Sequence, residues 1–130
     1  MWSWTNKNEE VCCRTVWLVG TRHRKNAAYV FHQSNRFIMK HLMKKCGLPE
    51  SRVPMTIEDM GNCGGPSIAV TMTRGLPAQR ERTQTLMLLG YGVGLSWGAA
   101  VIELDPQAPL IHSDYTGTIE RRGAKPAAAA

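Results

Sequence analysis

Three short segments of the sequence combine residue types that could act together on one carbonyl oxygen. Residues 32–35, His-Gln-Ser-Asn, lie between an apolar run at 27–31 and an amphipathic segment at 36–46. Residues 61–62, Gly-Asn, and the glycine-rich residues 90–98 follow later in the chain. A histidine at a strand-to-helix junction stands where open α/β sheets place their binding and catalytic groups. These three segments are therefore the first candidates for a functional site.

His32 and Asn62 are hydrogen-bond donors suited to a developing negative charge. A neutral imidazole donates one hydrogen bond and accepts another, so His32 could donate to a thioester carbonyl oxygen as charge builds up there. The Asn62 amide has no proton to lose and stays a donor throughout a reaction. Taken singly, a lone histidine is more often structural, and an asparagine among glycines is more often a turn residue. Together they predict an oxyanion or enolate hole.

The segment 92–94, Gly-Val-Gly, could add a backbone donor to this site. Small side chains at Gly92 and Gly94 would let a thioester approach the backbone, with the Val93 N–H as a further donor. The same residues also fit a simple hairpin turn. They are no dinucleotide-binding fingerprint, because no six-residue G-x-G-x-x-G occurs and a strand is expected after them.

The four cysteines follow no zinc-binding spacing. They are Cys12, Cys13, Cys46 and Cys63. The adjacent Cys12 and Cys13 cannot easily bridge each other, and Cys46 falls on the apolar face of a predicted helix. We therefore expect reduced thiols and a cytoplasmic protein. Cys63 has no evident base beside it in sequence, which favours an inert thiol over a nucleophile. No metal site is expected, and a site built from Cys12, Cys13, His23 and His32 is a weak alternative.

The elements that must position these residues form an α/β unit. The pattern predicts strands at 27–31, 53–57, 85–89 and 95–104, helices at 36–46 and 67–74, and a turn at 90–94. The resulting order is β-α-β-α-β-β. The first helix has a capping residue, Ser34 or Asn35, and a stop at Gly47. Residues 15–19 are β-prone. We expect residues 1–26 to be an atypical lead-in, 27–104 a domain and 105–130 an irregular tail.

Composition fits one soluble domain of 130 residues, with 43% hydrophobic residues and a formal net charge of +6. No apolar run reaches membrane-spanning length, and the N-terminus does not read as a signal peptide. The basic clusters lack the aromatic interleaving of a single-strand nucleic-acid platform, so neither a nucleic acid nor a membrane is expected as partner. A surface for an acidic protein or phosphate groups, or simply solvated faces, explains them equally well.

In this order and spacing, the three segments resemble the C-terminal half of the β-ketoacyl-acyl carrier protein synthase III family, in the thiolase-like superfamily. Residues 29–35 resemble its H-Q-A-N motif, with Ser34 in place of Ala. Residues 61–67 resemble its G-N-T-S-A-A-S segment, sharing Gly-Asn and the final Ser. Residues 90–100 resemble its closing G-F-G-x-G-x-S/T-W-G-A signature. The resemblance covers about residues 27–104.

The resemblance implies a layered αβαβα fold and an acyltransferase of fatty acid or related polyketide and lipid biosynthesis. The reaction it implies is a decarboxylative Claisen condensation of an acyl thioester with malonyl-acyl carrier protein, with no cofactor besides these substrates. The family's enolate-stabilising histidine and asparagine correspond to His32 and Asn62. Asn35 corresponds to a contact with the pantetheine arm, and Val93 to the backbone donor of the oxyanion hole.

The resemblance also implies partners, namely acyl carrier protein and acyl-CoA. A basic face around Arg36 and Lys40 would suit the acidic carrier protein, although the family's carrier-binding arginine falls at Phe37 here. The family's nucleophilic cysteine belongs to an N-terminal half. We therefore expect this chain to be a C-terminal piece that is inactive alone and works with a complementary half or as a homo-oligomer. The alternative is a non-catalytic subunit that binds carrier protein or a sister half.

Overall fold

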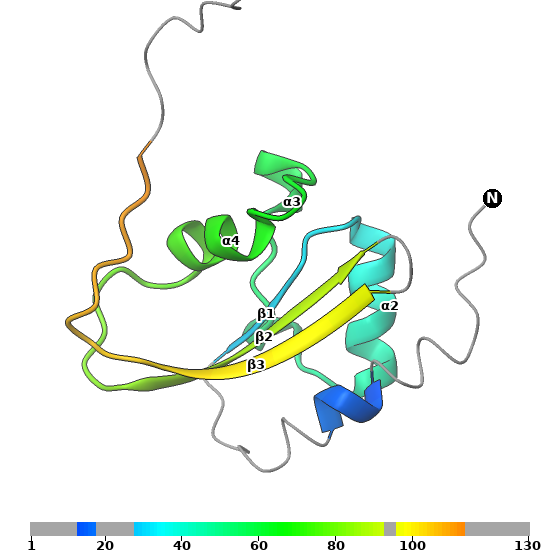
Figure 1. The fold of residues 1–130 in the computed structure, drawn as a ribbon, viewed down its shortest axis with the longest axis horizontal. Coiled ribbons are helices and arrows are strands. Elements are labelled where there is room, and N and C mark those ends of the chain that lie inside the picture. Colours follow the sequence, from blue (N-terminus) through cyan, green and yellow to red (C-terminus); the bar gives the residue numbers. More distant parts are fainter. Residues whose placement is uncertain (1–12, 18–27, 93–95, 114–130) are drawn as a thin grey trace, which may run out of the picture.

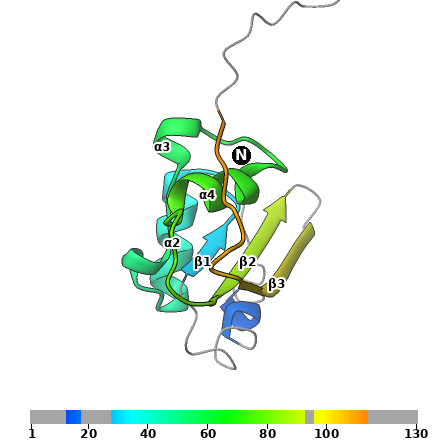
Figure 2. The ribbon, with the colours of Figure 1, turned by 90° about the vertical axis from the view of Figure 1, so that its left-hand side faces the viewer.

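The computed structural model describes residues 13–17, 28–92 and 96–113 (Figure 1). Its centre is a three-stranded sheet in the order β1-β2-β3, in which β1 (Ala28–Phe31) runs parallel to β2 (Gln84–Gly92) and β3 (Ser96–Leu104) runs antiparallel to it. Figure 2 shows the three strands side by side. Between β1 and β2 the chain forms four helical segments, which are α2 (Arg36–Cys46), the 3-10 turn η1 (Glu50–Arg52), α3 (Ile57–Met60) and α4 (Ser67–Gly75).

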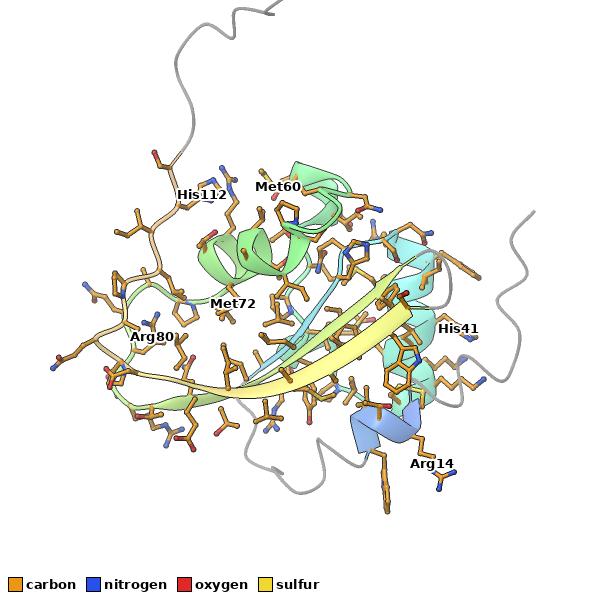
Figure 3. All side chains as sticks on the ribbon, in the orientation of Figure 1. Arg14, His41, Met60, Met72, Arg80 and His112 are labelled. Carbon is orange, nitrogen blue, oxygen red and sulfur yellow. A yellow bond between two sulfur atoms is a disulfide. The ribbon has the colours of Figure 1, made fainter. Side chains whose placement is uncertain are left out.

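Alternate strand residues face two separate layers of helix. Tyr29, Phe31 and Leu89 pack in one apolar cluster with Met39 and Leu42 of α2. Ala28, Val30 and Leu86 pack in a second cluster, against which Ile68 and Met72 of α4 lie, and Met72 points from α4 toward the sheet (Figure 3). All four residues of β1 are buried, as expected of a strand covered on both faces. The predicted α/β layered fold is confirmed.

Helix α2 has the predicted bounds because its ends carry clear signals. Of the two capping candidates, Asn35 is the one used: its side-chain oxygen accepts a hydrogen bond from the Ile38 N–H at 2.8 Å. Gly47 ends the helix in the left-handed conformation, with φ of 66°. Lys44 and Lys45 lie in the last turn, where positive charge stabilises the helix dipole.

The predicted strand at 53–57 is wrong, and the observed order is β-α-α-α-β-β once the short helix α3 is counted. Pro54 has no N–H to donate to a ladder. The N–H of Thr56 and the carbonyl of Pro54 are both bound by the side chain of Gln33 instead. Burial also does not follow the predicted alternation, because Val53 and Thr56 are buried while Met55 and Ile57 are only half-buried. Of the β-prone residues 15–19, residues 15–17 are helical and the last two lie outside the described residues.

The predicted turn at 90–94 is also wrong at its start, because residues 90–92 belong to a strand. Strand β2 continues to Gly92, which is paired with Ser96, and Tyr91 is paired with Trp97. A tyrosine favours a strand, and Gly90 and Gly92 have no positive φ that would break it. Val93 and Gly94 lie outside the described residues.

The prediction of reduced thiols is wrong for two cysteines, because Cys13 and Cys46 form a disulfide. The bond joins the helical residues 13–17 to the end of α2, across 33 residues of sequence. Adjacent cysteines such as Cys12 and Cys13 cannot easily bridge each other, but sequence spacing does not show whether two distant cysteines meet. Cys46 nevertheless packs against the core as predicted. Within the described residues, no helix is long and apolar enough to cross a membrane.

A buried arginine helps to attach the chain after β3 to the rest of the structure. Arg80 belongs to the loop between α4 and β2, is 8% exposed, and lies between this loop and the chain that follows β3 (Figure 3). Its guanidinium donates to the carbonyls of Pro77 and Ala78 on one side and of Asp105 and Ala108 on the other. The fork geometry of an arginine allows one side chain to satisfy several carbonyls at once.

We predict that Arg80→Met lowers the free energy of unfolding by about 2–3 kcal/mol, because several partly buried carbonyls lose their donor. Chemical denaturation of the full chain measures this loss. Arg82→Met is the matched control, since Arg82 is exposed two residues away, and it should change stability by about 0.5 kcal/mol or less. Equal effects of the two substitutions would contradict the assigned role of Arg80.

Candidate active site

The parallel pairing of β1 with β2 brings the first and third sequence segments together. Phe31 is paired with Leu89, and the backbone N–H of His32 donates to the Leu89 carbonyl at 2.8 Å. The chain then leaves the sheet at His32, while β2 continues to Tyr91 and Gly92. His32 therefore lies at the carboxyl end of β1, where α/β folds place their functional groups.

The His32 imidazole packs against the ring of Tyr91. The two ring centroids are 5.3 Å apart and the ring planes are nearly perpendicular, at 88°. Such edge-to-face contacts are favourable and restrict the tilt of both rings. Tyr91 is 9% exposed, whereas His32 is only half-buried and so remains accessible from outside.

Asn62 reaches the same place from the loop between α3 and α4. Its side-chain nitrogen donates to the Ser34 carbonyl at 3.3 Å, and its side-chain oxygen accepts from the Gly64 N–H at 2.9 Å. The second contact closes an Asx turn within the glycine loop, in which Gly61 and Gly64 both have positive φ. The amide is thus fixed with its oxygen toward its own loop and its NH2 group toward the loop that carries His32.

Gln33 is the positioning residue that the sequence reasoning left without a role. It is 1% exposed. Its amide nitrogen donates to the carbonyls of Phe31 at 3.0 Å and Pro54 at 3.4 Å, and its oxygen accepts from the Thr56 N–H at 3.0 Å. These bonds tie the end of β1 to the segment that leads into α3. The signal in the sequence that could have indicated this role is the Gln of the H-Q-A-N motif, which this chain shares.

The other predicted site residues are Asn35, Gly92, Val93 and Gly94, of which the structure describes the first two. Asn35 uses its side-chain oxygen as the cap of α2, and its contact with a pantetheine arm stays a prediction. Gly92 is exposed, and a Cβ added there would meet nothing within 4 Å. No contact within this part of the chain requires a glycine at that position. The roles predicted for Val93 and Gly94 lie outside the described residues.

An open apolar depression of about 600 Å³ adjoins the site. Its lining includes Ile68, Leu88, Tyr91, Gly92 and Trp97. His32 and Asn62 are not among the lining residues, so the depression meets the candidate site only through Tyr91 and Gly92. It could hold an apolar portion of a ligand beside the site, but it is not where the histidine and asparagine lie.

Cys63 has surroundings that fit an inert thiol better than a nucleophile. It is half-buried, and its thiol donates to the backbone carbonyl of Met60 at 3.4 Å. Among the residues that the structure describes, no three His, Cys, Asp or Glu side chains gather closely enough to hold a metal ion.

The outer face of α2 carries the two predicted carrier-protein contacts. Arg36 forms an ion pair with Glu58 of α3 at 2.5 Å, with both side chains more than half exposed. Lys40 is exposed one turn further on. Between them Phe37 is 79% exposed and stacks on His41, with ring centroids 6.3 Å apart. The positive charge of Arg36 is thus already opposed by a carboxylate, which leaves Lys40 as the better candidate.

Comparison with known proteins assigns the chain to a family. The sequence model of the family described as 3-oxoacyl-[acyl-carrier-protein (ACP)] synthase III C terminal matches residues 20–104. The chain therefore belongs to this C-terminal family of the synthases III. This confirms the resemblance inferred from the three motifs.

Individual relatives agree with that assignment. Beta-ketoacyl-[acyl-carrier-protein] synthase III from Coxiella burnetii is 40% identical over 74 residues, which are 56% of this chain and 23% of the relative. The enzyme of that name from Clostridium perfringens strain 13 is 30% identical over 79 residues, 60% of this chain and 24% of the relative. The crystal structure of 3-oxoacyl-(acyl-carrier protein) synthase from Burkholderia xenovorans LB400 superimposes with a TM-score of 0.70 and 37% identity, over 81% of this chain and 30% of that one. The chain spans about a quarter of the length of these curated relatives.

We predict that Gln33→Glu lowers the free energy of unfolding by about 3 kcal/mol, because a carboxylate oxygen would face two carbonyls in a buried place. Thermal or chemical unfolding of the full chain measures the change. The control is Gln79→Glu, the same substitution at an exposed position, which should change stability by about 0.5 kcal/mol or less. A Gln33→Glu chain as stable as this control would show that the amide does not hold the two segments together.

Proposed function

We propose that this chain supplies the histidine and asparagine of a β-ketoacyl-acyl carrier protein synthase III active site. The observation that supports the proposal is a continuous set of contacts among three distant segments. Asn62 binds Ser34 across 28 residues, Ser34 contacts Tyr91 across 57, and Tyr91 packs on His32. The sequence motifs that could do thioester chemistry are therefore neighbours in space.

The reaction that this arrangement would serve begins with loss of CO2 from a malonyl thioester. The bond between the α-carbon and the carboxylate breaks, and its electron pair is delocalised onto the thioester oxygen as an enolate. His32 and Asn62 would each donate a hydrogen bond from an N–H to that oxygen and so stabilise the negative charge of the enolate. The enolate carbon then attacks an acyl group carried as a thioester on a cysteine, which leaves as a thiolate.

The local geometry fits donor roles for both side chains. A primary amide has two N–H donors, and the contact with Ser34 uses one of them. The Gly64 N–H donates to the Asn62 side-chain oxygen, and this bond holds the amide with its NH2 group directed away from its own loop. The backbone of His32 is fixed by Leu89 and its ring by Tyr91, so the imidazole needs little reorganisation to donate.

The partners in this proposal are malonyl-acyl carrier protein, acyl-CoA and a nucleophile-bearing half that comes either from a complementary chain or from a homo-oligomer. Carrier proteins are acidic, and the exposed cationic face of α2 around Arg36 and Lys40 would attract them. Asn35 caps the amino end of the same helix, three residues after His32 in the sequence. A carrier protein docked there would bring its pantetheine arm toward the site.

We predict that His32→Ala and Asn62→Ala each reduce malonyl-CoA decarboxylation by about 10²–10³-fold, the usual cost of removing one oxyanion-hole donor. The assay uses a chimaera in which residues 28–104 replace the matched segment of the Coxiella burnetii relative. This arrangement supplies the nucleophile-bearing portion without relying on assembly of separate pieces.

His41→Ala is the matched control, because His41 points outward from α2 (Figure 3) and should leave decarboxylation unchanged. If decarboxylation persists in both site variants while the chimaera remains folded, the chain keeps the fold without the chemistry. The proposal would then give way to a non-catalytic subunit.

We further predict that Lys40→Glu in the same chimaera raises KM for malonyl-acyl carrier protein by about three- to tenfold, since an exposed charge pair contributes about 1 kcal/mol at an interface. KM for malonyl-CoA should not change, because that substrate does not need the protein surface. Arg82→Glu, at the opposite end of the sheet, makes the same charge change as a control. Parallel effects on the two substrates would exclude Lys40 as a carrier contact.

A further inference from the structure

Two hydroxyl groups meet inside the candidate site. The Ser34 side-chain oxygen lies 3.0 Å from the Tyr91 phenol oxygen. Both residues differ from the family motifs to which their segments are similar, where alanine stands at the place of Ser34 and phenylalanine at that of Tyr91. Each difference adds one hydroxyl group, and the structure places these two groups in one hydrogen bond.

The two differences depend on each other physically. Tyr91 is 9% exposed, and a buried phenol without a partner costs free energy that a bonded one does not. The hydroxyl of Ser34 is one such partner. With alanine at position 34 the Tyr91 hydroxyl would lose this hydrogen bond, and with phenylalanine at position 91 as well there would be no phenol left to lose it. The pair thus behaves as a coupled exchange rather than as two independent changes.

Ser34 also connects the two proposed donors. Its carbonyl accepts the hydrogen bond from Asn62, while its hydroxyl binds the far end of the Tyr91 ring. That ring is therefore fixed at both ends, by its Cβ in strand β2 and by its hydroxyl at the loop after β1. Because the long axis of the ring is fixed, the ring keeps its place in the edge-to-face contact with the imidazole of His32.

We infer that the Ser34–Tyr91 hydrogen bond is a positioning pair that sets the orientation of the His32 imidazole. The consequence for catalysis rests on the function proposed above, but the orientation itself does not. Ser34 and Tyr91 act through His32 and need not touch the substrate.

The test compares the full 130-residue chain with Ser34→Ala, Tyr91→Phe and the double variant, by thermal unfolding and by NMR spectra of the His32 ring. Ser34→Ala should lower Tm by about 4 °C or more, because the buried phenol loses its hydrogen bond to Ser34. The double variant should recover most of that loss. The ring signals of His32 should shift in both single variants, and Ser34→Ala should cause no further shift when Tyr91 is already phenylalanine.

Tyr29→Phe is the matched control, since it removes a hydroxyl from another buried tyrosine of the same cluster and should leave the His32 signals in place. Additive changes in Tm, or His32 signals unchanged by Ser34→Ala, would overturn the inference. If Ser34→Ala does not fold, the comparison of Tyr91→Phe with the double variant still decides, because the inference requires their His32 signals to coincide.

The chimaera separates this inference from the proposed function. If both the positioning pair and the proposed function are correct, Ser34→Ala lowers kcat for malonyl-CoA decarboxylation by about three- to tenfold. The double variant then restores kcat, as expected for coupled neighbours. Coupled His32 signals together with a His32→Ala chimaera of full activity would keep the positioning pair and reject the catalytic role. Uncoupled His32 signals together with an inactive His32→Ala chimaera would keep the catalytic role and reject the positioning pair.

Discussion

The buried side-chain amide of Gln33 is the contact on which the geometry of the site depends. It uses its nitrogen and its oxygen on backbone groups from two segments, at the end of β1 and before α3. A buried amide with both ends satisfied fixes its neighbours, while one with an end unsatisfied would destabilise them. Gln33 is flanked by His32 and Ser34, and the segment it holds leads into the helix and loop that carry Asn62. His32 and Asn62 thus share one anchor.

A second constraint comes from the register of the sheet. In β1, the odd-numbered residues face α2 and the even-numbered residues face α4, and both sets are buried. A slip of one residue would exchange the two sets, so the pairing of Phe31 with Leu89 is strongly determined. Because Tyr91 lies two residues beyond Leu89 on the same strand, that pairing also sets the meeting of Tyr91 with His32. The core therefore determines the site.

The sequence predicted the parts of the molecule that local patterns control. Helix 36–46 has apolar periodicity, a capping asparagine and a glycine stop, and the structure has it with those bounds. Three motifs in order were enough to identify the family. The same local patterns misled where a distant side chain competes with the backbone, as at residues 53–57, where Gln33 takes the bonds that a strand would need. No local pattern could show that Cys13 reaches Cys46 or that Ser34 reaches Tyr91, because these contacts depend on how the layers pack.

The central claim is that His32 and Asn62 donate to the same thioester oxygen. A crystal structure of the chimaera with a non-decarboxylating malonyl-thioester analogue tests it most directly. We expect the thioester oxygen within hydrogen-bond distance, about 2.7–3.2 Å, of a His32 ring nitrogen and of the Asn62 side-chain nitrogen. An analogue whose thioester oxygen binds elsewhere, with both side chains directed to other protein groups, would contradict the claim.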